Sequence, residues 1–235
     1  MDLAYTVERL AGDVFALSQG GHVRCFLLVG QERALLVDTC FGGDLRAVVA
    51  ELTDKPVTLV STHSDGDHTG GDEDFPSHYI HAAELPRYRA LNPDRAAPIH
   101  IKEGFVFDFA PFRLEVVHLP GHTPGSIALL ERRRRFLISG DNLATVPVYL
   151  FGGGRDVPLY RKSLDKLKSY AAAFDVIYPS HGSLPLFPER IDETIAAMDA
   201  ILAGQGEVSE ADNPRFPPDV KCYAANGCSF FMHEF

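Results

Sequence analysis

The stretch Thr62-His63-Ser64-Asp65-Gly66-Asp67-His68-Thr69-Gly70-Gly71 decides how this chain is interpreted. It places four side chains that can bind a metal within six residues: His63, Asp65, Asp67 and His68. The stretch follows an apolar segment that is predicted to be a strand, and its glycines allow a loop to turn several side chains inward. Imidazole nitrogens and carboxylate oxygens are common ligands of divalent metals in proteins. The segment therefore predicts a metal site at the end of a strand.

Three more potential ligands stand where other predicted strands run out into Gly or Pro. His122 lies in the loop that follows the segment FRLEVVH, Asp141 ends FLISGD, and His181 ends VIYPSH. Binding and catalytic groups gather at strand ends and in loops. Each of these residues alone would more often be structural. Together with the four residues of the first segment, they predict one shared site.

The composition describes an ordinary globular chain, because 46% of its 235 residues are hydrophobic and 23% are charged. The formal net charge of -10 makes a nucleic-acid partner improbable, since such partners require clustered positive charge. No apolar run reaches the roughly 18 residues of a membrane span. The start of the chain shows no secretory signal, so a cytoplasmic location is predicted. We find no linker, and residues 1–235 are predicted to form a single domain.

The four cysteines, at positions 25, 40, 222 and 228, are too few for a disulfide scaffold. Reduced thiols are expected in a cytosolic protein. Cys222 and Cys228 flank an Asn-Gly turn and could lie opposite each other on a hairpin, so a disulfide between them is conceivable.

Hydrophobic spacing predicts a mixed order of strands and helices. Strands are expected at 14–18, 25–30, 34–39, 57–62 and 78–82 and throughout 105–140, with a Pro-rich connector after residue 82 and an exposed turn at 132–135. Helices are expected at 45–52, 164–174 and 191–202, with Pro188 in the first turn of the last one. A hairpin is expected around Asn226-Gly227. This order favours the α/β (α+β) class, with sheets packed face to face and helices outside.

The order of the motifs along the chain resembles that of the metallo-β-lactamase superfamily. The segments LLVDT, THSDGDHTGG, LPGHTPGS, SGDNL and PSHG follow one another in the order typical of that family and span most of the chain. The resemblance implies the metallo-β-lactamase fold, a four-layer αβ/βα sandwich. It also implies a site for two metal ions at the edge between the two sheets.

The resemblance further implies a role for each candidate residue. One metal would be held by His63, Asp65 and His122, the other by Asp67, His68 and His181, and Asp141 would bridge both. Asp38, in LLVDT, would orient a ligand histidine through its other ring nitrogen. His22 and Tyr149 would border the pocket.

The chemistry that such a site implies is hydrolysis. A bound divalent metal lowers the pKa of its water toward ~7, and two ions ~3.5–4 Å apart can share the resulting hydroxide. Asp67 would orient that hydroxide and carry a proton toward the leaving group. We expect two divalent ions, with zinc the first choice and iron or manganese as alternatives. The expected substrate is a small ester, thioester, lactone or related acyl compound.

Asp65 is where this sequence departs from the common family motif HxHxDH, which has histidine at that position. The extra negative charge predicts a weaker Lewis acid at the first metal. Flavodiiron proteins share the fold and also carry a carboxylate there, so a di-iron redox or oxygen-binding protein is an alternative function. A phosphodiesterase and a metal-binding module without catalysis are further alternatives.

Overall fold

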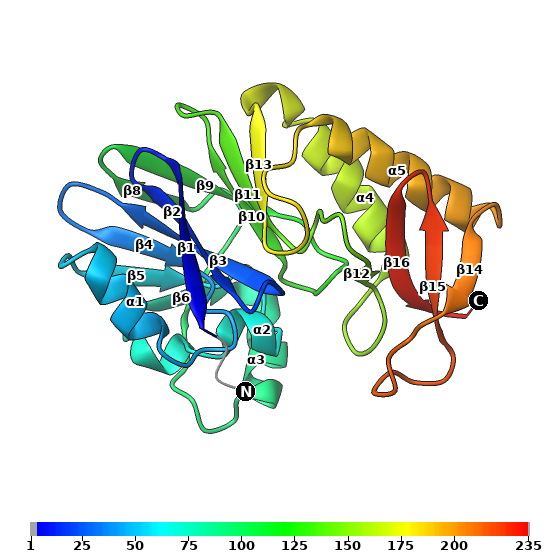
Figure 1. The fold of residues 1–235 in the computed structure, drawn as a ribbon, viewed down its shortest axis with the longest axis horizontal. Coiled ribbons are helices and arrows are strands. Elements are labelled where there is room, and N and C mark those ends of the chain that lie inside the picture. Colours follow the sequence, from blue (N-terminus) through cyan, green and yellow to red (C-terminus); the bar gives the residue numbers. More distant parts are fainter. Residues whose placement is uncertain (1–3, 235) are drawn as a thin grey trace.

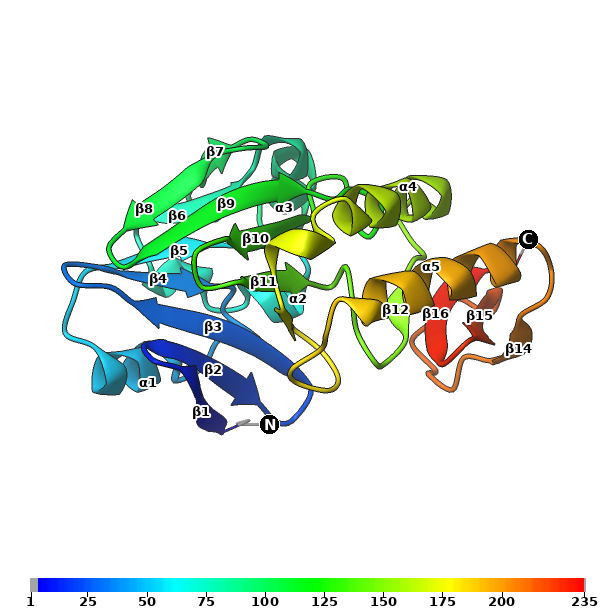
Figure 2. The same ribbon diagram turned by 90° about the horizontal axis from the view of Figure 1, so that it is seen from above.

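The computed structural model of this chain describes residues 4–234. Two sheets pack face to face (Figures 1 and 2), and a smaller third sheet lies beside them. The first sheet has seven strands in chain order: β1 (Tyr5–Ala11), β2 (Val14–Gln19), β3 (Val23–Val29), β4 (Ala34–Val37), β5 (Val57–Val60), β6 (His78–His81) and β7 (Ile99–Ile101). The second has the order β13-β11-β10-β9-β8: β8 (Val106–Phe109), β9 (Phe112–His118), β10 (Ile127–Glu131), β11 (Phe136–Gly140) and β13 (Val176–Pro179).

Helices cover the outer faces of both sheets. They are α1 (Leu45–Leu52), α2 (Gly66–Thr69), α3 (Leu85–Leu91), α4 (Val157–Lys168) and α5 (Glu189–Leu202), with short 3-10 helices at Asp72–Asp74, Ala82–Glu84 and Ala171–Ala173. Within residues 4–234, no helix combines the length and apolar character needed to cross a membrane.

Three hydrophobic cores separate the layers. Leu45 and Val49 of α1 pack with Leu36 on the outer face of the first sheet. A second core, which includes Phe26 and Leu129, joins the two sheets. The third core lies between the second sheet, α4, α5 and the small sheet. The four-layer αβ/βα sandwich that the sequence predicted is therefore confirmed.

The third sheet joins β12 (Val148–Tyr149) to the end of the described chain, in the order β12-β16-β15-β14. Its other strands are β14 (Glu207–Glu210), β15 (Val220–Ala225) and β16 (Cys228–His233). Tyr149 stands opposite Phe231 in the parallel pair of β12 and β16. Consequently, the C-terminal hairpin supports a segment that lies about 80 residues earlier in the chain (Figure 1).

Most of the predicted elements are present, and several predictions need correction. The sequence patterns missed β1, β7, β12, β14, α2 and α3. Of these, α2 lies where a loop was expected, and α3 occupies the presumed Pro-rich connector. The helix predicted at 164–174 is α4, which starts earlier and ends earlier, at Lys168. It starts earlier because Asp156 accepts a hydrogen bond from the Leu159 amide (2.8 Å) and caps the first turn. Pro188 occupies the N-cap position of α5, directly before its first turn.

The predicted hairpin at Asn226-Gly227 is present, but the suggested disulfide between Cys222 and Cys228 is absent. Asn226 and Gly227 both have positive φ (48° and 72°), as a two-residue hairpin turn requires. This tight turn pairs Ala225 with Cys228 and leaves Cys222 opposite Phe231. Both cysteines are free. The predicted single domain of residues 1–235 includes residues 1–3 and 235, which lie outside the described residues.

Candidate metal centre

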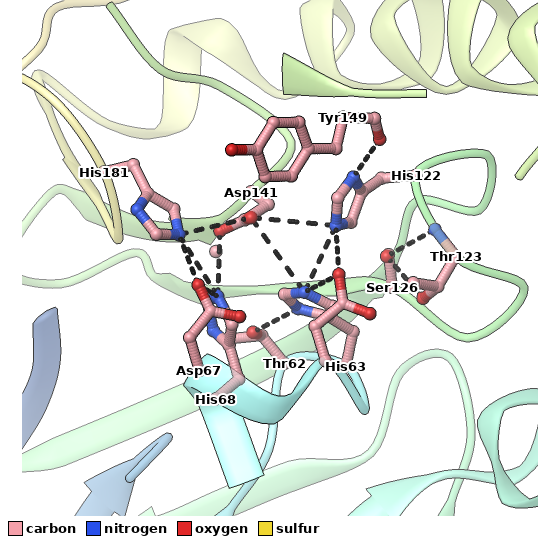
Figure 3. A network of polar contacts seen from close by, with 12 residues as sticks. Thr62, His63, Asp67, His68, His122, Thr123, Ser126, Asp141, Tyr149 and His181 are labelled. Carbon is pink, nitrogen blue, oxygen red and sulfur yellow. Dashed lines mark hydrogen bonds and ion pairs between the residues drawn. The ribbon is translucent and has the colours of Figure 1, made fainter. Parts of the chain in front are cut away.

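The seven predicted ligands come together at one edge of the sandwich, where the ends of four strands meet. Figure 3 labels all of them except Asp65. His63 and Asp65 follow β5, and the short helix α2 carries Asp67 and His68. The other three residues follow β9, β11 and β13. Because β11 and β13 run parallel, Asp141 and His181 leave the second sheet side by side. Strand direction thus delivers all seven side chains to one place.

Three of these side chains surround what we call the first metal position. The Nε2 atoms of His63 and His122 lie 3.1 Å apart. The Oδ2 atom of Asp65 lies 3.4 Å from the first of these nitrogens and 3.3 Å from the second. Both histidines are fully buried.

Three other side chains surround the second metal position. The Nε2 atoms of His68 and His181 lie 3.3 Å apart. The Oδ2 atom of Asp67 lies 3.8 Å from the first of these nitrogens and 3.4 Å from the second.

Asp141 lies between the two positions. Its Oδ1 atom is 3.2 Å from His68 Nε2, and its Oδ2 atom is 3.4 Å from His181 Nε2 and 3.6 Å from His122 Nε2. Its Oδ1 atom is buried and has no hydrogen-bond partner among the described residues. A carboxylate between two groups of imidazoles is arranged to serve two cations.

The hydrogen bonds of the histidines test whether these residues suit a metal. Each Nδ1 donates to an oxygen, leaving Nε2 as a bare lone pair in the neutral ring. The acceptors are Asp38 for His68 (2.8 Å), the His22 carbonyl for His181 (2.6 Å) and the Tyr149 carbonyl for His122 (2.8 Å). His63 donates to Thr62 Oγ1 (3.0 Å), whose own proton goes to Asp38.

In this arrangement four lone pairs and three carboxylates face one another, and only positive charge can stabilise them together. The electrostatics of the centre agree with that requirement. Burial works against the charged form of His181, yet Asp141 and Asp67 raise its pKa to about 10. Burial also opposes protonation of His68, but Asp141, Asp67 and Asp38 raise its pKa well above the usual range. The donor set and its charge therefore fit divalent cations.

Asp38, which was predicted to orient a ligand histidine, lies beside His68. It is fully buried at the end of β4 and accepts hydrogen bonds from the Thr62 amide (2.7 Å), Thr62 Oγ1 (2.8 Å) and His68 Nδ1. Its backbone has a φ of 64°, a rare conformation for a residue other than glycine. His22 differs from the expectation, because its side chain is exposed and only its carbonyl contacts the centre. The Tyr149 ring lies over Asp141 (Figure 3) and is 40% exposed.

Three residues that contact this centre were not predicted from the sequence. Glu84, fully buried at the start of α3, accepts hydrogen bonds from the Ser64 and Gly125 amides and the Thr123 hydroxyl. It thereby ties the loop of His63 to the loop of His122. Arg87 and Arg155 both contact Asp65. No motif surrounds these residues, so no sequence signal could have identified them.

Comparison with known proteins agrees with this geometry. The sequence profile of the metallo-beta-lactamase superfamily matches residues 19–181, which include all seven residues of the centre. The chain belongs to this superfamily. A metallo-beta-lactamase from Pontibacter korlensis has the same fold, with a TM-score of 0.72, 18% sequence identity, and coverage of 83% of this chain and 99% of that one.

Two curated relatives of this superfamily member have names that describe thioesterases. An acyl-coenzyme A thioesterase from Gallus gallus is 27% identical over 52% of this chain and 58% of its own length. An atrochrysone carboxyl ACP thioesterase from Aspergillus chevalieri is 30% identical over 66% of this chain and 50% of its own length. The chain spans between half and three fifths of the length of such relatives.

Proposed function

We propose that this protein is a metal-dependent hydrolase of an acyl thioester. The observation that carries the proposal is the convergence of four bare imidazole nitrogens and three carboxylates on two adjacent positions. The first position would be held by His63, Asp65 and His122, and the second by Asp67, His68 and His181. Asp141 would bridge them. Zinc is the first candidate for both ions, since it accepts histidine and carboxylate ligands readily.

When bound, two divalent ions supply an activated water at neutral pH and polarise the carbonyl oxygen of a substrate. The chain's own residues would complete the reaction. Asp67 has the most exposed of the three carboxylates, at 25%, and lies beside the second position. It can orient the attacking water, accept its proton and pass that proton toward the departing sulfur. Asp67 would therefore act as the general base.

Tyr149 is placed to contact the substrate from above the centre. Burial, together with the charges of Asp67 and Asp141, raises the pKa of its phenol. The phenol therefore keeps its proton at neutral pH and can donate a hydrogen bond to the substrate's carbonyl oxygen. Its neighbours Phe151, Phe216 and Phe231 form an aromatic wall, with ring centroids 5.3–5.8 Å from that of Tyr149. Such a wall suits the apolar part of an acyl group.

The choice of a thioester among acyl compounds is supported by the names of the two curated relatives. The centre itself would also accept an ester or a lactone, because each presents a carbonyl carbon to an activated water. The proposed substrate class therefore depends on similarity, whereas the proposed hydrolysis depends on the geometry of the residues.

The test begins with protein purified without chelator. We expect two divalent ions per chain by elemental analysis, and hydrolysis of acyl-coenzyme A in preference to a lactone and a phosphodiester. A chelator should abolish the activity, and added zinc should restore it. Asp67→Asn should lower kcat, whereas the distant surface variant Arg161→Met should behave as the parent. Metal-loaded protein that hydrolyses none of the three substrates would contradict the proposal.

One observation favours a second candidate, a di-iron redox or oxygen-binding protein. Asp65 adds a hard carboxylate ligand to the first position, and such ligands suit iron better than purely imidazole sites do. Iron as the metal present after purification, with a visible absorption band and no hydrolytic turnover, would favour this alternative.

A further inference from the structure

The carboxylate of Asp65 is bound by two arginines. Arg87 Nη2 lies 2.6 Å from Oδ1, and Arg155 Nη2 lies 2.6 Å from Oδ2. The three side chains are only 18%, 10% and 14% exposed for Arg87, Arg155 and Asp65, so solvent screens these ion pairs weakly. The Oδ2 atom also faces the nitrogens of His63 and His122. Asp65 is thus shared between the first metal position and two fixed cations.

The two arginines reach Asp65 from separate elements, and each is anchored by a further contact. Arg87 belongs to α3, donates to Ser64 Oγ (2.7 Å) and lies 3.7 Å from the Glu84 carboxylate. Arg155 belongs to the glycine-rich segment between β12 and α4, and its Nε donates to the Tyr149 carbonyl (3.3 Å). That carbonyl is the one that orients His122.

The charges around Asp65 balance. Two carboxylates, Asp65 and Glu84, carry two negative charges, and the two guanidinium groups carry two positive ones. The position that holds a neutral histidine in HxHxDH is therefore filled by a carboxylate whose charge is already compensated. A carboxylate that shares its electrons with guanidinium groups donates less charge to a metal.

We propose that Arg87 and Arg155 are positioning residues of the first metal position, an inference that rests on the metal-dependent function proposed above. They fix the Asp65 carboxylate so that Oδ2 points at His63 and His122, and they offset its negative charge. The first metal would then experience a ligand set close to that of three neutral imidazoles. This revises the sequence-based expectation that Asp65 weakens the Lewis acidity of that ion.

The experiment compares Arg87→Met and Arg155→Met with Arg161→Met. Arg161, on α4, is the matched control, because it is 19% exposed and its guanidinium pairs with Asp165 and Asp199 (2.6 Å each), neither of which belongs to the centre. Each variant is stripped of metal and titrated with Zn²⁺ against a chromogenic chelator, and the absorption spectrum of the Co²⁺-loaded protein is recorded. Neither measurement requires turnover.

Without either guanidinium the Asp65 carboxylate is free to turn away from the metal, and this loss of orientation should outweigh the removal of a repelling charge. We therefore expect one of the two binding steps to weaken about 10–100-fold in Arg87→Met and Arg155→Met, the usual effect of losing a partner of a metal ligand. The other step and both steps of Arg161→Met should match the parent. The Co²⁺ spectrum should change with the weakened step. Arg155→Lys keeps the charge but not the planar fork of donors, and should recover part of the loss.

A reverse test uses the ligand itself. Asp65→His alone would leave two arginines without their main partner beside the metal, and should weaken the first position. The double variant Asp65→His with Arg155→Met removes one of these charges and should bind Zn²⁺ more tightly than Asp65→His alone. Equal affinities for these two variants would overturn the inference.

The outcomes separate this inference from the function on which it rests. A parent protein that binds no divalent metal would refute the proposed function. A parent with two metals, and arginine variants with unchanged titrations and spectra, would overturn only the positioning role. An unchanged titration with a raised KM in Arg155→Met would also overturn it, and would assign Arg155 to substrate binding. If the Met variants do not fold, Arg155→Lys decides the question: a weakened binding step is expected there too, and a titration and spectrum identical to the parent would overturn the positioning role.

Discussion

Glu84 allows a quantitative test of how the metal centre is held together. Its carboxylate is fully buried and accepts the Ser64 amide at 3.0 Å and the Gly125 amide at 2.7 Å. The backbones are in close contact here, since a Cβ added to Gly125 would lie 2.4 Å from the Cβ of Glu84. Neither amide has room to find another acceptor without moving its loop. Glu84 is therefore predicted to contribute both to folding and to metal affinity.

The magnitude follows from counting the donors that each variant leaves unpaired. Glu84→Ala removes the acceptor of four donors; the Ser64 and Thr123 hydroxyls can rotate, but the two buried amides are left unpaired at about 1–3 kcal/mol each, so the free energy of unfolding should fall by about 2–6 kcal/mol. Glu84→Gln keeps one oxygen for Ser64 but turns an NH₂ group toward the Gly125 amide, so the loss should be about 1–3 kcal/mol. Domains of this kind are stable by only about 5–15 kcal/mol, so both losses are measurable.

The assay is urea denaturation of metal-free protein, followed by Zn²⁺ titration of the folded variants. Glu131 provides the control, because it is fully buried in the second sheet and accepts the Arg113 and Arg134 amides away from the centre. Glu131→Gln should lose stability but keep the parent's metal affinity, whereas Glu84→Gln should lose both. The reasoning would be refuted if Glu84→Ala unfolded within about 0.5 kcal/mol of the parent, the range of ordinary surface substitutions.

Three other predictions follow from the same structure. Asp38→Ala removes the acceptor of His68 Nδ1 and should weaken metal binding about 10–100-fold without abolishing it, as measured by chelator competition. Asp141→Ala removes the shared carboxylate, so elemental analysis should find fewer than one ion per chain after dialysis, whereas two retained ions would exclude a bridging role. Burial and the nearby His118 lower the pKa of His81 to about 4, below the ~6.5 of an unfolded histidine, so the unfolded state takes up its proton first. Stability should therefore rise from pH 4 to pH 6.5, and His81→Gln should flatten that rise in denaturation curves recorded across this range.

The main features of the fold could be predicted from the sequence because the apolar patterns of its central strands are strong. Residues 25–29 of β3 and all of β4 are continuous apolar runs, and most of these residues are buried. β1 escaped detection because its residues are mostly exposed at the edge of the sheet. α3 was missed because Pro86 and Pro98 suggested a connector, yet Pro86 stands in the first turn of the helix, where proline is tolerated.

The convergence of the seven centre residues could also be predicted, since each follows a strand and strand ends share an edge. The sequence did not reveal what surrounds them. Glu84, Arg87 and Arg155 act through contacts between segments 20 to 90 residues apart, and such contacts leave no local pattern. The carbonyls of His22 and Tyr149 were also beyond prediction as acceptors, because every residue carries the same backbone oxygen.

The attachment of β12 to β16 has a consequence for how specificity can diverge among related chains. Only Val148 and Tyr149 of that strand pair with the C-terminal hairpin, and the Leu150 amide adds one bond to the Phe231 carbonyl (2.8 Å). The segment that carries Tyr149 over the centre is therefore attached to the third sheet by a few backbone pairs, and none of the seven ligands takes part in them. Substitutions in residues 203–219, such as a change of Phe216 beside the Tyr149 ring, can reshape this side of the pocket without replacing a ligand. The segment that carries Tyr149 also contacts two ligands, through the Tyr149 carbonyl to His122 and through Arg155 to Asp65, so substrate preference can diverge only as far as these contacts are kept.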